Sequence, residues 1–106
     1  MEFKITGPFK NNFYNLMREI GYISTGTDER NGQMSFVNPV GGAGRYGYPR
    51  FHIYLVVKGN DMFFDLHLDQ KKPSYKGTTA HSGEYDGETV AKEAKRIKQI
   101  LKNESL

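Results

Sequence analysis

The side chains best suited to chemistry lie in one segment, residues 50–69, which contains two of the three histidines of the chain. Apolar and polar residues alternate on both sides of a Lys-Gly-Asn-Asp sequence at 58–61, which predicts two antiparallel strands joined by a tight turn. If its Gly-Asn pair forms the turn, His52 lies directly opposite His67. One face of the hairpin is then entirely apolar, and a one-residue slip would mix polar with apolar groups, so the register is well determined.

The opposite face of this hairpin gathers the titratable side chains. They are Arg50, His52, Tyr54, Asp65, His67 and Asp69. Directly opposed residues have Cβ atoms about 4.5–5.5 Å apart, so the two imidazoles would lie beside each other with carboxylates close by. Two neutral histidines and an aspartate form a ligand set for a divalent metal such as zinc or manganese, with water completing a catalytic site. The pattern is also typical of a solvated sheet face, on which polar cross-strand pairs are ordinary.

The third histidine, His81, lies in the segment that follows the hairpin and could fold back over the polar face. Under the metal hypothesis the ligands are then His52, His67, Asp69 and His81. Such a site predicts a small metal-dependent hydrolase or nuclease. The absence of cysteine excludes thiolate zinc sites and cysteine nucleophiles, and the sequence contains no Walker loop, G-x-S-x-G elbow or H-E-x-x-H motif.

Two loops flank this face and carry basic and aromatic side chains. The first, 40–49, is rich in glycine and contains Arg45 and Tyr46. Its 42–47 segment matches G-x-G-x-x-G, but a strand rather than a helix follows, so the loop lacks the helix N-terminus that holds a dinucleotide. We interpret it either as a flexible strand connection or as a loop that presents Arg45 and Tyr46 to a ligand.

The second loop, 70–85, has no periodicity and carries Lys72, Tyr75 and Lys76. Lysine ammonium groups can contact phosphates, and an aromatic ring can stack on an unpaired base. A solvated lysine-bearing loop is the alternative. Together with the polar face, these loops predict a non-catalytic binding module, without a cofactor, for a phosphorylated ligand or nucleic acid. We rank this function above the metal-dependent hydrolase.

The remaining sequence predicts the elements that position this surface. Residues 1–6 alternate as a strand, 9–20 carry one apolar helical stripe ended by Gly21, 22–27 and 33–38 form a hairpin, and a last helix begins at 87 or 88 behind an Asp86 cap. Two helices with one apolar stripe each need an apolar sheet face to cover. We therefore predict a single α+β domain over residues 1–106. It is a two-layer sandwich, β-α-β-β-β-β-α, with two helices on one face of an antiparallel sheet of four to five strands.

Composition limits the remaining classes. The chain has 106 residues and a net charge of +3 from 15 basic and 12 acidic side chains. No apolar run is long enough to span a membrane, and the first residues lack the apolar core of a signal peptide, so we expect a cytoplasmic protein without membrane contact. Val56 and Phe63, an apolar pair at the turn end of the polar face, are typical of a contact surface and predict a monomer or a weak homodimer.

The stretch from His67 to Gly87 reads HLDQKKPSYKGTTAHSGEYDG, and a helix rich in Glu and Lys follows it. It resembles a pattern in small uncharacterised bacterial proteins, and the likeness covers roughly the last half of the chain. The resemblance implies only that loop 70–85 forms one unit with the strand of His67 and Asp69. No activity is assigned to such proteins, so the resemblance transfers no catalytic residue.

Overall fold

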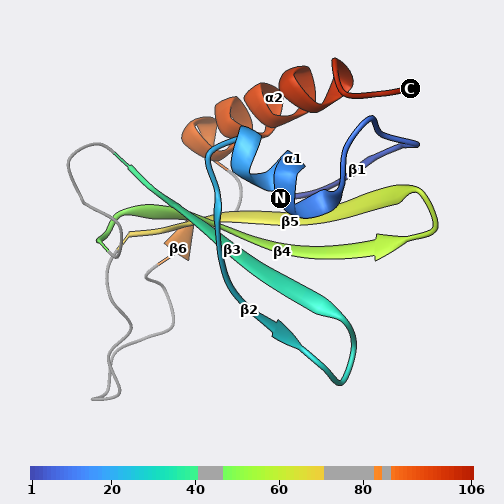
Figure 1. The fold of residues 1–106 in the computed structure, drawn as a ribbon. Helices are drawn as coiled ribbons and strands as arrows, with labels where there is room; N and C mark the ends of the chain where they lie inside the picture. The colour runs from blue at the N-terminus through green and yellow to red at the C-terminus, as the bar shows by residue number, and fades with distance from the viewer. Residues whose placement is uncertain (41–46, 71–82, 85–86) are drawn as a thin grey trace.

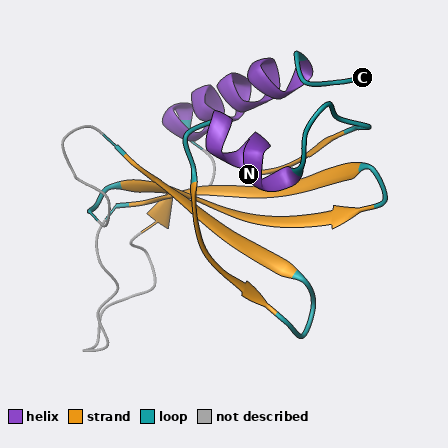
Figure 2. Ribbon diagram, in the orientation of Figure 1, coloured by secondary structure: helices purple, strands orange, loops and turns teal. Residues whose placement is uncertain are grey.

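The computed structural model describes residues 1–40, 47–70, 83–84 and 87–106 (Figure 1). Its elements are β1 (Glu2–Ile5), α1 (Phe13–Glu19), β2 (Ile23–Asp28), β3 (Gln33–Pro39), β4 (Arg50–Lys58), β5 (Asp61–Asp69), β6 (Gly83–Glu84) and α2 (Glu88–Lys102). The strands form one antiparallel sheet in the order β1-β5-β4-β3-β2, and both helices lie on the same side of it (Figure 2). The predicted α+β sandwich is confirmed.

The β4–β5 hairpin has the predicted register throughout. Its pairs run from Arg50 opposite Asp69 to Lys58 opposite Asp61, with His52 opposite His67 between them. The turn glycine, residue 59, has a φ of 61°, a left-handed conformation that favours glycine over residues with a Cβ atom. Local turn chemistry and the alternating pattern therefore agree on a single register.

Strand β5 is flanked along one edge by two short strands from distant parts of the chain. Strand β1 pairs with residues 62–65 of β5, and β6 pairs with Leu68 and Asp69. Loop 70–85 was expected to lack regular secondary structure. This expectation is wrong for Gly83 and Glu84, which form β6. Two residues are too few to show a period-two pattern, so β6 depends on its backbone pairing to β5 rather than on a sequence signal.

The first helix is shorter than the predicted 9–20 range. It begins after Asn12, whose side-chain oxygen accepts a hydrogen bond from the Asn15 backbone N–H at 2.9 Å. Such an N-cap starts the helix at that residue. Phe9 still packs against the core, but it does so from a backbone bridge to Ser105. The second helix begins at 88 as predicted, although its N-cap is Gly87 rather than Asp86, which lies outside the described residues.

The core lies between the helices and the apolar face of the sheet. Its fully buried members include Leu16 and Met17 from α1, Ile20 just after it, Ile53, Leu55, Met62 and Leu66 from the hairpin, and Val90, Ile97 and Leu101 from α2. Burying one such side chain contributes about 1.5–3 kcal/mol. Neither of the described helices combines the length and the apolar character needed to cross a membrane.

A buried polar network joins α2 to the segment that enters β2. The Tyr22 hydroxyl donates to Glu93 Oε2 at 2.6 Å, and the Arg96 guanidinium donates to both oxygens of the same carboxylate at 2.7 and 2.8 Å. Arg96 also donates to the Ile20 carbonyl at 2.6 Å. Burial and then the charge of Glu93 raise the pKa of Tyr22 well above that of free tyrosine, so the phenol stays a donor.

Candidate metal centre

Asp69 contacts three other polar side chains on the polar face of the sheet. Its Oδ1 lies 3.0 Å from His67 Nε2, and its Oδ2 lies 3.3 Å from His52 Nδ1. The Arg50 Nε donates to Oδ2 at 3.4 Å. These four side chains come from two residue pairs that are neighbours on the polar face of the β4–β5 hairpin, so the register of that hairpin brings them together.

Two of the spacings between donor atoms are close to those in the coordination sphere of a small divalent cation. Two ligands at about 2.0–2.1 Å from a tetrahedral ion lie about 3.3 Å from each other. The distances from Asp69 to the two imidazole nitrogens are 3.0 and 3.3 Å, and one donor atom from each of the three residues lies within 4.8 Å of the others. His52, His67 and Asp69 therefore form a set of ligands that could bind one ion.

This end of the sheet face is not a solvated surface. His67 is only 5% exposed, and the side chains of His52 and Asp69 are 12% and 21% exposed. The ring of Tyr54 packs against both imidazoles, with centroids 4.4 Å from His52 and 5.8 Å from His67. Charges interact more strongly in such surroundings than in water, and packed rings keep their orientation, which favours a defined site over ordinary cross-strand pairs.

The electrostatics of the cluster favour an ionised carboxylate. Burial alone would raise the pKa of Asp69. Hydrogen bonds from His52 and His67, together with the charge on those rings, outweigh burial and hold the pKa well below the usual range of aspartate. Asp69 therefore stays negative at every pH at which a metal ion would bind.

This lowered pKa predicts an acid-sensitive contribution to stability. A carboxyl whose pKa is lower in the folded than in the unfolded protein stabilises the fold above its unfolded pKa of about 4, and that stability is lost as pH falls toward the folded pKa. We expect Asp69→Asn to be less stable than wild type at pH 6 and to lose less stability between pH 4 and pH 2. Urea unfolding at several pH values measures how the free energy of unfolding of each protein changes across this range. Equal changes in wild type and Asp69→Asn would show that Asp69 is not the group responsible.

Ser35 is a site residue that the sequence analysis missed. Its Oγ lies 2.6 Å from His52 Nε2, the ring nitrogen that points away from Asp69, and Thr25 donates to the same Oγ at 2.7 Å. Metal-bound histidines usually have their second nitrogen fixed by such a hydrogen bond. The register between β3 and β4 places Ser35 opposite Tyr54, and loop 40–49 between these strands is not a two-residue turn from which that register could be derived.

The same contacts also place Ser35, His52 and Asp69 in the order of a serine hydrolase triad. Each nitrogen of His52 faces the expected partner, the hydroxyl on one side and the carboxylate on the other. A triad, however, needs only one imidazole on its carboxylate, whereas His67 directs a second one at Asp69. Two nitrogens and one carboxylate that converge are what a metal requires, so the metal centre accounts for more of the geometry.

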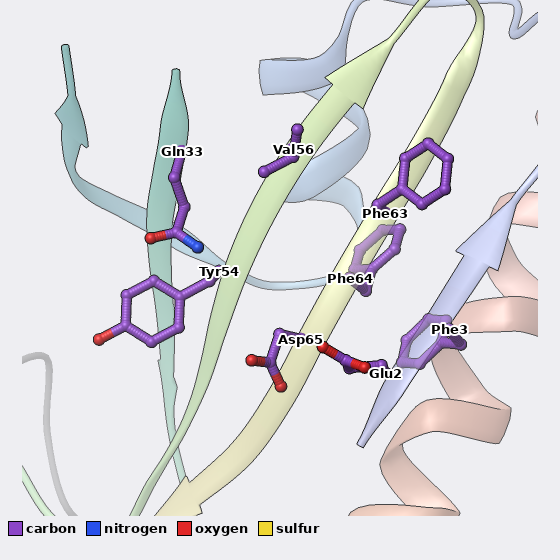
Figure 3. A pocket seen from close by; sticks show the side chains of 8 residues that line it. All are labelled: Glu2, Phe3, Gln33, Tyr54, Val56, Phe63, Phe64 and Asp65. Atoms are coloured by element: carbon purple, nitrogen blue, oxygen red, sulfur yellow. The ribbon is translucent and has the colours of Figure 1, made fainter. Parts of the chain in front are cut away.

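The other residues predicted for the polar face have different surroundings. Arg50 also stacks on Tyr48, with its guanidinium carbon 4.5 Å from the ring centroid. Asp65 lies 3.8 Å from the amino group of Met1 and lines a neighbouring pocket (Figure 3). The remaining predicted residues are Arg45, Tyr46, Lys72, Tyr75, Lys76 and His81, and they lie outside the described part of the chain. Their roles stay predictions.

The chain was compared with models of protein families, with curated proteins and with solved structures. None of them matches it. The resemblance of the His67–Gly87 stretch to small bacterial proteins thus stays a prediction. Function must be inferred from the chemistry of Asp69 and the groups around it.

Proposed function

We propose that this protein binds a divalent metal ion, zinc or manganese, through His52, His67 and Asp69, and that the ion supports hydrolysis of a substrate. The observation that carries the proposal is the convergence of two imidazole nitrogens on the Asp69 carboxylate at 3.0 and 3.3 Å. Three protein ligands leave a position for water, whose pKa falls to about 7 on zinc.

Arg50 and Ser35 fit this function without being ligands. The guanidinium of Arg50 lies against the Asp69 carboxylate and can neutralise negative charge that develops on a substrate oxygen. Ser35 holds the His52 ring with Nδ1 toward Asp69. If His81 were the fourth ligand that the sequence suggested, it would fill the fourth position of a tetrahedral ion, and water would then need a fifth position.

A binding module for a phosphorylated ligand or nucleic acid is a weaker proposal. The basic and aromatic loop residues that suggested it lie outside the described part of the chain; they are Arg45, Tyr46, Lys72, Tyr75 and Lys76. On the described face, the carboxylates of Glu2 and Asp65 line the pocket beside the histidines, and they would repel a polyanion.

Metal binding is tested by titrating dialysed protein with Zn²⁺ and Mn²⁺ in a calorimeter. Asp69→Asn and His67→Gln are expected to weaken binding by about 10- to 100-fold, at least as much as the loss of an outer hydrogen bond does. A free-metal concentration near 100 Kd should stabilise wild type by about 2.7 kcal/mol. Asp65→Asn is the matched control, because this carboxylate lies on the same face and is not one of the three residues grouped closely enough to hold an ion, and it should bind like wild type.

Two results would contradict the metal centre. One is an absence of binding by wild type, and the other is an equal loss of affinity in Asp65→Asn and Asp69→Asn. His81→Gln, measured in the same way, tests the fourth ligand. Hydrolysis of chromogenic phosphate and carboxylate esters, with and without a chelator, then shows whether the bound ion is catalytic.

A serine hydrolase is the second candidate, because Ser35, His52 and Asp69 are already hydrogen-bonded in the required order. A fluorophosphonate that labels wild-type protein covalently in the presence of a chelator, but does not label Ser35→Ala, would favour the serine hydrolase. Under the metal proposal Ser35→Ala only lowers metal affinity, by roughly tenfold.

A further inference from the structure

The apolar pair on the polar face, Val56 and Phe63, lies at a pocket of about 370 Å³ (Figure 3). The pocket is lined by Glu2, Phe3, Gln33, Tyr54, Val56, Phe63, Phe64 and Asp65. Phe63 is 38% exposed there, although large apolar side chains on this sheet are otherwise mostly covered. A volume in this range suits a small organic ligand.

The lining combines apolar surface with negative charge. Val56 and the rings of Tyr54 and Phe63 offer an apolar wall, whereas Glu2 and Asp65 contribute two carboxylates. The described lining residues include no lysine or arginine. In Figure 3 the two carboxylates lie close to each other on one side of the pocket, with the Phe63 ring farther along the same strand as Asp65.

Cations of the chain itself already lie at this rim. The amino group of Met1 is 3.8 Å from Asp65 Oδ1, and Lys58 Nζ is 5.6 Å from the centroid of the Phe63 ring. Both the carboxylate and the ring face are thus open to ammonium groups, which carboxylates attract by charge and aromatic faces by their quadrupole. Glu2 has no ion-pair partner among the described residues, so negative charge remains for a ligand.

The pocket adjoins the candidate metal centre. On this face the Tyr54–Asp65 pair is the neighbour of the His52–His67 pair. It lies two residues farther along each strand, a separation of about 7 Å. The Tyr54 ring lines the pocket and packs on His52 as well. A molecule held in the pocket would therefore reach the metal centre with a group only a few bonds from the part that the pocket holds.

A second copy of this chain fits the same surface less well. A stable protein–protein interface buries about 800 Å² on each partner. Val56 and Phe63 supply only two apolar side chains, and the carboxylates of Glu2 and Asp65 lie beside them. Two copies meeting at this face would bring like charges together.

We propose that this pocket binds an organic ammonium group carried on an apolar body, an alkyl or aryl amine, and that it recognises the substrate of the neighbouring metal centre. The second half of the inference rests on the proposed function, but amine binding does not. The ammonium lies at Glu2 and Asp65, and the apolar body lies against Val56 and Phe63.

The test uses the full chain, labelled with ¹⁵N and ¹³C, and three probes of one shape: phenethylamine, 3-phenylpropionate and 2-phenylethanol. Phenethylamine should shift the ring signals of Phe63 and Tyr54 in a saturable way, and the acid should not. Glu2→Gln and Asp65→Asn should each weaken amine binding by roughly two- to fivefold, the worth of an exposed charge pair. Glu88→Gln, which removes an exposed carboxylate of α2 that does not line the pocket, should bind the amine like wild type.

The outcomes separate this inference from the proposed function. Amine binding without any metal binding leaves the pocket assigned and overturns the metal centre. Metal binding with no response to the amine, or equal binding of the acid and the amine, overturns the pocket assignment alone. Shifts of Phe63 that follow protein concentration rather than amine concentration would assign the surface to self-association and overturn it too.

Discussion

Replacing Glu93 by alanine is expected to lower the free energy of unfolding by about 2–4 kcal/mol. The Glu93 side chain is only 7% exposed, and it accepts hydrogen bonds from Tyr22 and Arg96. Its removal leaves the Tyr22 hydroxyl buried without this acceptor and deprives the guanidinium of its carboxylate. Both losses act on the same junction between α2 and the start of β2.

The matched control for this prediction is Glu88→Ala on the same helix. Glu88 pairs with Lys92 at 3.6 Å, but these side chains are 85% and 77% exposed, so the pair should contribute at most about 0.5 kcal/mol. Urea unfolding followed by circular dichroism measures both variants. Similar values for the two would mean that the Tyr22–Glu93–Arg96 network does not stabilise the fold.

Truncating Leu101 to alanine should cost about 2–5 kcal/mol. Leu101 is fully buried near the C-terminal end of that helix and belongs to the main core. Its loss removes apolar contacts and leaves a cavity between helix and sheet. Thermal unfolding should show a Tm lower by several degrees for each kcal/mol lost, as is usual for a chain of about 100 residues.

Leu106→Ala is the control, because the same side chain type is 78% exposed only five positions later. It should change stability by less than about 0.5 kcal/mol. Its backbone N–H donates to the Pro8 carbonyl, and the substitution leaves that bond in place. A loss in Leu106→Ala as large as in Leu101→Ala would show that α2 does not dock as described.

Much of the fold follows from local signals in the sequence. The alternation around the Gly-Asn turn predicts every pair of β4 with β5. The apolar spacing of α2 predicts the burial of Val90, Ala94, Ile97 and Leu101, but Ala91 of the same stripe is exposed and Glu93 outside it is buried. The start of α1 was predicted too early, because the apolar spacing extends back to Phe9 while the Asn12 side chain caps the helix. A side-chain N-cap sets where a helix begins, even where the apolar period extends to residues before the cap.

The candidate site was only partly predictable. Placing His52 opposite His67 needed only the hairpin, and the metal hypothesis already named Asp69 as the carboxylate ligand. In the structure Asp69 contacts both imidazoles, whereas Asp65 lies by the Met1 amino group at the edge where β1 joins the sheet. The surroundings of Asp65 depend on a pairing between segments about 60 residues apart, and no local pattern encodes them.

The sequence by itself determined the hairpin register and the helix faces, because turn geometry and periodicity act over a few residues. Only the tertiary structure decided that Ser35 reaches His52, that His67 is buried, and that Val56 and Phe63 border a pocket. These features arise where strands from distant parts of the chain meet. Their relative register is set by packing of the whole sheet on its helices, and loop 40–49 does not specify it.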